Sequence, residues 1–510
     1  MILRPVRAAV AAGAVVLALA LPGVAAAGGR PPSPGAAGIG DRLYPTLGNG
    51  GYDVWHYDIA WRYPTAAPAS PVTGTVTIDA KATQSLSSFD LDWAGTSYGA
   101  VAVNGRPAAV VQDGEDIVIT PEKPVHKGSR FRVVVARYTA TPTAVDPEVD
   151  SSSAFFDTPD GTATAAQPNF AHLFLPSNDH PRDKATFTFH LDVPDGMTAV
   201  ANGDLVSKTT PEPGRTVWNY DLRRPMATEL VQIAAGDYDV TERGAVEGVT
   251  VRDVTPKRLT AQLDPALSTV TAQIPWMQAR VGRYPFGIYG SLVVDDIPFA
   301  LETQTLSVYG LSWFTQLPQG VWEPTMVHEL SHQWFGDSVA PYEWSDIWLN
   351  EGHATWYEIN YAEEHGQLAE DSAGLFGEEG YADIESYMRA AYAAADDYRA
   401  QYGPVAVPPD GTLNGLFSPN VYEGGALVLY ALRQEIGPDA FDALERAWVS
   451  TYENGVASTA DFVALASKVA GRDVGPFLHA WLYDETTPPM PGHPDWTVDP
   501  VAAPEPVPAA

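Results

Sequence analysis

The segment at residues 327–332, Val-His-Glu-Leu-Ser-His, constrains this chain more than any other part of it. It places two histidines four residues apart, with a glutamate directly after the first. On an α-helix, positions i and i+4 lie on one face, so His328 and His332 can point at a single ion. Glu329 lies one step round the helix, where it can reach a metal-bound water without being a ligand. The segment predicts a helix that carries a metal site; the alternative is two surface histidines on an ordinary helix.

A third ligand is available farther along the chain. A catalytic zinc site needs three protein groups and an open position for water. Glu351 follows His332 with eighteen residues between them, within the stretch Trp-Leu-Asn-Glu-Gly. Two antiparallel helices joined by a short loop can bring this carboxylate to the same ion. We therefore predict one zinc ion held by His328, His332 and Glu351. His353 lies two residues from Glu351 and should point away from the ion, as a packing or supporting residue.

Helical patterns cover most of the second half of the chain. They span residues 264–281, 325–335, 346–365, 423–436 and 461–469. In the first, Asp264 is expected to be the cap, Pro275 to kink or split the helix and Gly282 to end it. Pro324 suits the first turn of the helix that carries the histidines, and Gly336 suits its end. Ser345 is expected to cap the helix that carries Glu351.

The first half of the chain has a different pattern. From about residue 42 to residue 240, β-forming residues alternate or cluster between Gly, Pro, Asn and Asp, as in Thr-Phe-Thr-Phe-His-Leu at residues 186–191. The fold class predicted is α+β multidomain, with an N-terminal β-sandwich-like domain followed by a mainly α-helical catalytic domain. The expected divisions are 1–27 signal peptide, 28–40 flexible leader, 41–240 β domain, 241–490 zinc-binding catalytic domain and 491–510 Pro/Ala-rich tail.

The N-terminus has the pattern of an export signal. Arg4 and Arg7 precede an apolar run at residues 8–21, and three alanines at residues 25–27 suit cleavage after Ala27. The run is short for a membrane span, although an uncleaved anchor helix is the alternative. We expect a secreted, extracellular protein with no membrane span in its mature form; retention at the cell wall is the alternative to free release. A monomer is the expected state.

Composition excludes several classes of function. The chain has 30 Lys and Arg against 63 Asp and Glu, a formal net charge of −33. Nucleic acid is therefore not an expected partner, because phosphate binding needs a basic surface. The sequence contains no cysteine, which removes thiol catalysis and thiolate metal ligands. A chain of this length can bury a large core without disulfides.

The metal segment and its surroundings resemble a known family. His-Glu-Leu-Ser-His-Gln-Trp-Phe-Gly-Asp at residues 328–337, followed by Trp-Ser-Asp-Ile-Trp-Leu-Asn-Glu-Gly at residues 344–352, looks like the aminopeptidase N family of gluzincins, which also contains the leukotriene hydrolase branch. Supporting stretches lie at residues 44–53, 183–187 and 481–489. The resemblance implies that the catalytic domain is thermolysin-like and that the chain is a zinc metallopeptidase, a metalloaminopeptidase that hydrolyses peptides with a free N-terminus.

Three further positions carry over from the resemblance. Glu302, in Phe-Ala-Leu-Glu-Thr, matches the family glutamate that binds the substrate's free amino group; a solvated glutamate at a strand edge is the alternative. Phe299, Leu301 and Thr303 depart from the family pattern of Gly, Met and Asn. Tyr422 matches the tyrosine that stabilises the tetrahedral intermediate, with Tyr430 as a competitor better explained by core packing. Gln167 matches a β-domain residue that reaches toward the substrate amine.

The expected function is a secreted aminopeptidase that uses a zinc-activated water, with Glu329 as general base. Because Phe299 changes the substrate segment, one alternative is a gluzincin with endopeptidase or other hydrolase activity. A second alternative is an inactive binding protein on this scaffold. The side chain preferred at the N-terminus of the substrate does not follow from the sequence.

Overall fold

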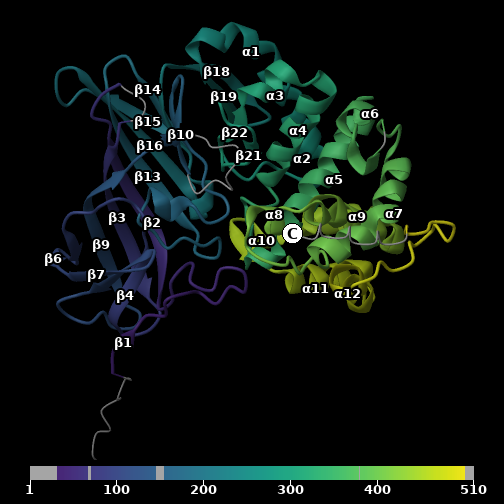
Figure 1. Cartoon of the computed structure of the whole chain (residues 1–510), viewed down its shortest axis with the longest axis horizontal. Coiled ribbons are helices and arrows are strands. Elements are labelled where there is room, and N and C mark those ends of the chain that lie inside the picture. The colour runs from purple at the N-terminus through teal and green to yellow at the C-terminus, as the bar shows by residue number, and fades with distance from the viewer. Residues whose placement is uncertain (1–30, 67–69, 145–153, 378, 500–510) are drawn as a thin grey trace, which may run out of the picture. The chain divides into compact units, whose positions relative to one another are not determined.

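The computed structural model describes residues 31–66, 70–144, 154–377 and 379–499 (Figure 1). The chain divides into two compact units, residues 1–31 and 32–510, and the architecture below is that of the second. The predicted signal peptide and the last eleven residues of the predicted tail lie outside the described residues. Among the described residues, no helix combines the length and apolar character needed to span a bilayer.

Strands make up the first half of the second unit, as the alternating pattern predicts. Buried and more exposed side chains alternate along β13 (Ala185–Pro194), and along β2 (Tyr52–Arg62) apart from a register shift between Val54 and His56. This is the period expected when one face of a strand meets a core. The two strands pair in parallel at the centre of the largest sheet, whose order is β15-β16-β13-β2-β3-β9-β5-β6. The other members are β3 Val72–Ala82, β5 Val101–Val103, β6 Arg106–Pro107, β9 Arg130–Ala140, β15 Asp204–Thr209 and β16 Arg215–Met226.

Two smaller sheets complete this part. One has the order β10-β11-β12-β17-β14, from β10 Thr143–Ala144, β11 Phe155–Thr158, β12 Gly161–Thr164, β14 Thr198–Ala201 and β17 Ile233–Gly236. The other has the order β1-β4-β8-β7, from β1 Ser33–Pro34, β4 Leu86–Asp92, β7 Ala109–Asp113 and β8 Asp116–Thr120. Part of the predicted leader thus forms β1, which pairs in parallel with β4.

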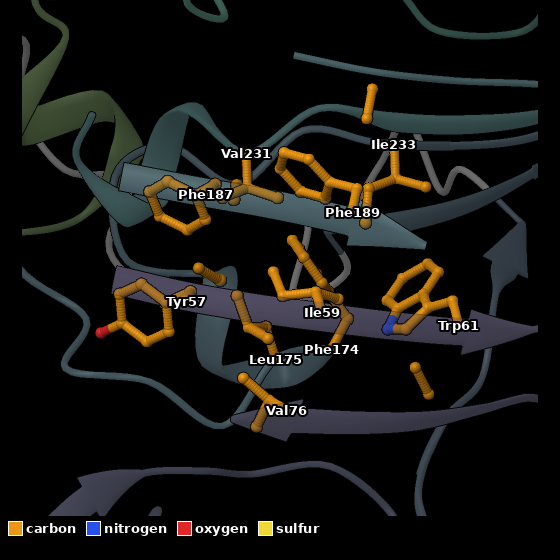
Figure 2. Close-up of a cluster of buried hydrophobic side chains, with 14 of the residues drawn as sticks. Tyr57, Ile59, Trp61, Val76, Phe174, Leu175, Phe187, Phe189, Val231 and Ile233 are labelled. Carbon is orange, nitrogen blue, oxygen red and sulfur yellow. The ribbon is translucent and has the colours of Figure 1, made fainter. Parts of the chain in front are cut away.

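The core of the β domain lies between the largest sheet and the sheet that contains β17. Figure 2 shows Tyr57, Ile59 and Trp61 of β2 pointing toward the same cluster as Phe187 and Phe189 of β13 and Ile233 of β17. Tyr57 and Phe187, which are partners in the parallel register, stack with ring centroids 5.0 Å apart. Burial of aromatic and β-branched side chains between sheets is the main stabilisation of such a layer.

The second domain begins with its own sheet, of order β18-β19-β20-β22-β21. Its strands are β18 Tyr238–Val246, β19 Val249–Pro256, β20 Ile288–Val294, β21 Ala300–Leu301 and β22 Ser307–Gly310. Every residue of β20 is buried, as in a strand covered on both faces. A short parallel pair, β23 Val339–Pro341 with β24 Gly455–Ala457, lies later in the domain.

Helices form the rest of the domain. Their bounds are α1 Thr260–Leu267, α2 Val270–Val281, α3 Leu311–Gln316, α4 Gln319–His332, α5 Trp348–Glu364, α6 Leu368–Asp371, α7 Ile384–Tyr402, α8 Leu413–Leu416, α9 Pro419–Ile436, α10 Pro438–Tyr452, α11 Thr459–Ala470 and α12 Gly475–Tyr483. Short 3₁₀ turns lie at Ala171–Leu173, Thr228–Leu230, Lys257–Leu259, Trp344–Asp346 and Leu375–Gly377. This order, a β-rich domain followed by a helical one, confirms the predicted fold class.

Several predicted helix ends are wrong. The helix expected at residues 264–281 is split, but at Ser268 and Thr269 rather than at Pro275, which lies inside α2; Asp264 lies inside α1 and caps nothing. Gly282 does end α2, with a φ of 103°. Pro275 is tolerated because the carbonyl four residues before it belongs to Thr271, in the first turn of α2, where the helix is only beginning.

The helices that carry the predicted metal ligands also begin at other residues than expected. α4 starts at Gln319, so Pro324 lies inside it rather than in its first turn, and it ends at His332, four residues before Gly336. Ser345 caps no helix. It lies in the 3₁₀ turn before α5, where Glu343 and Asp346 form a capping box. Carboxylates here replace the hydroxyl that the sequence pattern favoured.

Lys184 of the β domain reaches the chain directly after α4. Its ammonium group donates hydrogen bonds to the carbonyl oxygens of Asp337 at 2.6 Å, Ser338 at 2.9 Å and Gly455 at 3.3 Å. Asp337 and Ser338 are themselves fully buried. The β domain thus supplies the donor that these backbone carbonyls need, and fixes the end of the metal-site helix.

Candidate metal centre and substrate site

The two histidines and the glutamate predicted as ligands meet at one point. Each of His328, His332 and Glu351 offers a ligand atom within 4.8 Å of the other two. The Nε2 atom of His328 lies 3.4 Å from Oε2 of Glu351, and Nε2 of His332 lies 3.3 Å from the same oxygen. All three residues are buried. Two imidazoles and one carboxylate are a donor set that fits zinc with one open position.

The outer nitrogens of both imidazoles are occupied. Nδ1 of His328 lies 2.8 Å from a carboxylate oxygen of Glu358, and Nδ1 of His332 lies 3.1 Å from the carbonyl oxygen of Phe335. An acceptor at Nδ1 favours the tautomer with the proton there, which leaves the Nε2 lone pair for a metal. Glu358 follows Glu351 by seven residues on α5, two helical turns, so one helix face supplies both the ligand and the support for another ligand.

The surroundings favour a cation. Burial alone would lower the pKa of His332, but Glu302 and Glu351 raise it to about 9. Burial likewise opposes protonation of His328, yet Glu358 and Glu351 raise its pKa well above the usual value. Burial would raise the pKa of Glu351, but His332 and His328 outweigh it and hold the pKa at about 2. A pocket that favours protons on its imidazoles in this way would also favour a divalent cation in their place.

Glu329 lies beside this group without belonging to it. It is buried on α4, and burial raises its pKa to about 8, against the opposing effect of His328 and His332. A carboxylate whose affinity for a proton is raised in this way is suited to take a proton from water and pass it on.

Glu302 and Gln167 form a second polar pair next to the metal group. Glu302 is buried directly after β21, and its Oε1 atom accepts a hydrogen bond of 2.7 Å from Nε2 of Gln167. The same oxygen lies 3.9 Å from Nδ1 of His332. Glu302 is therefore not the solvated strand-edge glutamate of the alternative interpretation. Gln167 comes from the β domain, and the structure places it next to Glu302. Both residues were predicted to bind the substrate amine.

Tyr422 reaches the site from α9. Its ring stacks on the imidazole of His328, with centroids 5.9 Å apart and planes inclined by 20°. Burial raises its pKa well above 10, so the phenol keeps its proton and can donate it in a hydrogen bond. The competing Tyr430 is buried and its hydroxyl lies 3.1 Å from Nε2 of His493, away from the metal ligands, in agreement with its interpretation as a core residue.

The close approach of α5 and α9 places Glu351 and Tyr422 together. A Cβ atom added to Gly352 would lie 2.8 Å from the carbonyl carbon of Gly425, so only glycines allow these backbones to touch. Gly352 follows Glu351 directly, and Gly425 lies three residues after Tyr422. Figure 1 shows α5 and α9 side by side. The crossing explains why glycines accompany both functional side chains.

Phe299 and Thr303, two of the three departures from the family pattern, have structural roles. The Phe299 ring contacts Phe156 of the β domain, with centroids 5.9 Å apart, and its carbonyl oxygen accepts a hydrogen bond from the amide of Gly310. Thr303 is fully buried, and its hydroxyl donates to the carbonyl oxygen of Leu306. Phe299 therefore packs at the junction of the two domains, and Thr303 closes the turn after Glu302.

His353 packs away from the metal group, as predicted. It is fully buried, its Nδ1 atom lies 2.7 Å from the carbonyl oxygen of Leu349, and its ring stacks on Phe335 with centroids 4.3 Å apart. The ring of Phe335 is thus held by His353 while its carbonyl contacts His332.

Two supporting residues were missed by the sequence reasoning. Glu358 contacts His328 as described above, and its position two turns after Glu351 could have revealed it. Gln333 is fully buried between the two halves of the site: its Nε2 atom donates to the carbonyl oxygen of Glu302 at 2.9 Å, and its Oε1 atom accepts from the amide of Thr305 at 2.9 Å. No spacing rule in the sequence connects Gln333 to the segment around Glu302.

Such a constellation, one metal group with an adjacent buried carboxylate, is that of a metal-dependent hydrolase. Comparison with known families agrees. The peptidase family M1 domain matches residues 277–481, and the peptidase M1 N-terminal domain matches residues 55–230. The chain belongs to the M1 peptidases, the aminopeptidase N-type gluzincins, and zinc is accordingly its metal.

Individual relatives support this assignment. The chain is 28% identical to aminopeptidase N of Streptomyces lividans over 66% of this chain and 39% of that protein. It is 26% identical to aminopeptidase M1-B of Oryza sativa subsp. japonica over 62% of this chain and 36% of the relative. The chain thus spans less than half the length of these curated relatives. An M1 zinc metallopeptidase from Deinococcus radiodurans, solved with a Tyr-Ser-Ala substrate, superposes with a TM-score of 0.75 at 28% identity, covering 90% of this chain and 100% of that chain.

Proposed function

We propose that this protein is a secreted, zinc-dependent aminopeptidase that removes N-terminal amino acids from peptides. The observation that carries the proposal is the Glu302–Gln167 pair, in which a buried carboxylate lies 3.9 Å from a metal-ligand imidazole. A buried carboxylate and an amide oxygen can together bind an ammonium group. The distance between the Glu302 carboxylate and the metal group suits a substrate whose α-amino group lies one residue from the bond that is cut.

The positions of the residues support a role for each. His328, His332 and Glu351 would hold zinc, which would supply Lewis acidity to water and to the scissile carbonyl. Glu329 takes the proton from the attacking water and later delivers it to the leaving amine. The Tyr422 hydroxyl donates a hydrogen bond to the oxyanion of the tetrahedral intermediate, an effect worth about a hundredfold or more in rate. Glu302 and Gln167 hold the substrate ammonium, and Glu358 orients His328.

The test is hydrolysis of amino-acid anilides by the zinc-loaded protein. We expect turnover of anilides with a free α-amino group and little turnover of the N-acetylated anilides. Glu302→Ala should raise KM for the free substrates by about tenfold or more, because a charge-assisted hydrogen bond is lost. Glu329→Ala should retain zinc and lose turnover. Equal cleavage of free and acetylated substrates by the parent protein would contradict the aminopeptidase proposal.

An endopeptidase or other hydrolase on the same metal group remains the second candidate, because Phe299 alters the segment before Glu302. Blocked internal peptides distinguish the two: an endopeptidase cuts them at internal bonds, whereas an aminopeptidase leaves them intact. The inactive binding protein is the third candidate. Zinc bound in stoichiometric amount without turnover of either substrate class would favour it.

Secretion is part of the proposal and is supported by the N-terminal sequence. The basic residues, the apolar run and the three alanines together suit an export signal. Expression in the native host followed by N-terminal sequencing should give a mature protein that begins at Gly28. Recovery of the intact N-terminus from the cell pellet would contradict this part of the proposal. The distribution of the protein between the medium and the cell wall distinguishes free release from retention. The size of the purified protein shows whether it is a monomer.

A further inference from the structure

A cleft distinct from the metal site lies where the two domains meet. Its volume is about 620 Å³, and it is bounded by β15 and β16, the segment after α2, the end of α4, and α10. None of Glu302, His328, Glu329, Glu351 and Tyr422 is among its lining residues. Ligand sites are commonly found at domain junctions, and this volume is in their usual range.

The floor of the cleft is formed by apolar residues with little exposed surface. It includes the buried side chains of Leu222, Val281, Tyr284, Phe286, Trp334 and Val449. The indole nitrogen of Trp334 donates a hydrogen bond of 3.0 Å to the carbonyl oxygen of Arg283, which fixes the segment after α2 against the metal-site helix. Because its side chains are packed in the core, the small apolar surface that the floor exposes is preformed.

Four arginines line the cleft: Arg223, Arg224, Arg283 and Arg446. They stand out because acidic residues exceed basic residues by 63 to 30 in the chain. Arg223 already has anionic partners. Its Nε atom lies 2.7 Å from a carboxylate oxygen of Asp221, and the charge of Asp204 also raises its pKa. Arg446 donates a hydrogen bond of 3.1 Å to the carbonyl oxygen of Ala279. This neutral acceptor does not compensate the positive charge of the guanidinium group.

Arg224 and Arg283 have no such partner. Within the part of the chain that the structure describes, neither guanidinium group makes a hydrogen bond or an ion pair. Apart from Asp204 and Asp221, Glu453 is the one carboxylate among the lining residues, and it is outnumbered by Arg224, Arg283 and Arg446. A guanidinium group presents a planar fork of donors that matches a carboxylate or a phosphate. The cleft therefore combines an apolar floor with cationic groups that lack anions.

We propose that this cleft binds an organic anion, in which a carboxylate or phosphate is attached to an apolar group. Arg224 and Arg283 contact the anionic end, and the apolar group covers the floor. The site is separate from the metal centre, and its existence does not depend on the aminopeptidase activity.

The experiment is titration calorimetry on the zinc-loaded full-length protein with phenyl phosphate and, in parallel, phenylacetate. We expect at least one of them to bind, more tightly than inorganic phosphate because the ring covers the apolar floor. The double variant Arg224→Gln/Arg283→Gln should lose affinity by about tenfold or more, since each guanidinium makes a charge-assisted contact. Arg389→Gln, at an exposed arginine on α7 outside the cleft, is the matched control and should bind as the parent does.

Three results would overturn the proposal. Absence of binding by both aromatic anions up to about 10 mM, a concentration that would detect even weak association, is the first. The second is unchanged affinity in the double variant, which would place the anion at the zinc instead. The third is equal affinity for inorganic phosphate, which would remove the role of the floor. The variant Arg224→Lys/Arg283→Lys keeps the charges and should recover part of the lost affinity, so a folding defect cannot imitate the result.

Discussion

Gly352 and Gly425 touch where α5 crosses α9: a Cβ atom on Gly352 would lie 2.8 Å from the carbonyl carbon of Gly425 and 2.9 Å from its Cα. Both of these neighbours are backbone atoms, so no side-chain rotation can relieve the clash. The metal ligand Glu351 precedes one glycine, and Tyr422 lies one turn before the other. The distance between the two helices therefore controls the distance between these two functional groups.

Gly352→Ala should therefore damage both stability and activity. Forcing one methyl group into this contact costs about 1–3 kcal/mol, and the separation of the helices should lower zinc affinity and kcat together. Gly287→Ala is the control, because a Cβ atom there would meet no atom within 4 Å. Thermal unfolding, zinc content and anilide turnover are the measurements. A Gly352→Ala protein that matches its parent in all three would contradict the proposed role of the crossing.

The second prediction concerns Glu358, which contacts Nδ1 of His328 at 2.8 Å. Glu358→Ala should weaken zinc binding by about 10–100-fold, the usual effect of removing a residue that orients a metal ligand. Glu358→Gln keeps an acceptor for the imidazole N–H but not the charge, so its loss should be smaller.

The matched control for Glu358 is Glu364→Gln on the same helix. The Glu364 side chain bonds to Trp276 and Arg280 and has no contact with the imidazoles. Competition with a fluorescent zinc chelator measures all of these variants. Equal zinc affinity in Glu358→Ala and in the parent would show that Glu358 does not support the metal.

The metal-site residues could be predicted from the sequence because their spacing is a local geometric rule. His328 and His332 share a helix, and helical periodicity alone places both on one face. Glu302, Tyr422 and Gln167 were found only through resemblance to a family, since nothing local connects β21, α9 and the β domain. The structure brings all of these residues together. Their individual roles stay proposals that the variants above test.

The helix ends could not be predicted with the same rules. Pro324 was expected to mark the first turn of α4, yet five helical residues precede it, because buried contacts of residues such as Gly320 and Glu323 extend the helix backward. Ser345 was expected to cap α5, but the capping role belongs to Glu343 and Asp346. Tertiary packing overrides local preference at such ends. Gln333 was missed for a related reason: its partners at Glu302 and Thr305 are distant in sequence.

The third prediction concerns protons displaced by zinc. Burial alone would disfavour charged imidazoles, but Glu302 and Glu351 raise the pKa of His332 to about 9, and Glu358 and Glu351 raise that of His328 well above its usual value. We therefore expect both imidazoles to be protonated at pH 7 in the metal-free protein. Because zinc binds the neutral form, its binding should release about two protons at pH 7 and fewer as the pH rises through about 9.

Calorimetry in buffers of different ionisation enthalpy measures this release. Glu302→Gln should reduce the release near pH 8, because it removes one of the carboxylates that raise the pKa of His332. Zinc binding at pH 7 without release of protons would mean that the imidazoles are already neutral in the metal-free protein.

The last prediction concerns Lys184, whose ammonium group donates to three backbone carbonyl oxygens beyond α4. Burial lowers its pKa from 10.5 to about 8, against the opposing charges of Asp337 and Glu229. Between pH 8 and 10.5 the unfolded chain therefore binds a proton that the folded protein does not, and the stability contributed by this group rises with pH across that window. Below pH 8 both states are protonated, and the contribution no longer changes.

Lys184→Met removes this titration and leaves buried carbonyls without a donor. The variant should be less stable than the parent by about 1–3 kcal/mol, and the difference should grow from pH 8 to pH 10.5, where the parent alone gains. Lys81→Met, at an exposed lysine on β3, should show no such difference. Urea unfolding of the three proteins at pH 7, 8, 9 and 10 provides the comparison. A difference between Lys184→Met and the parent that stays constant from pH 8 to pH 10 would mean that Lys184 keeps an ordinary pKa, and that the contact between the domains is more hydrated than its burial indicates.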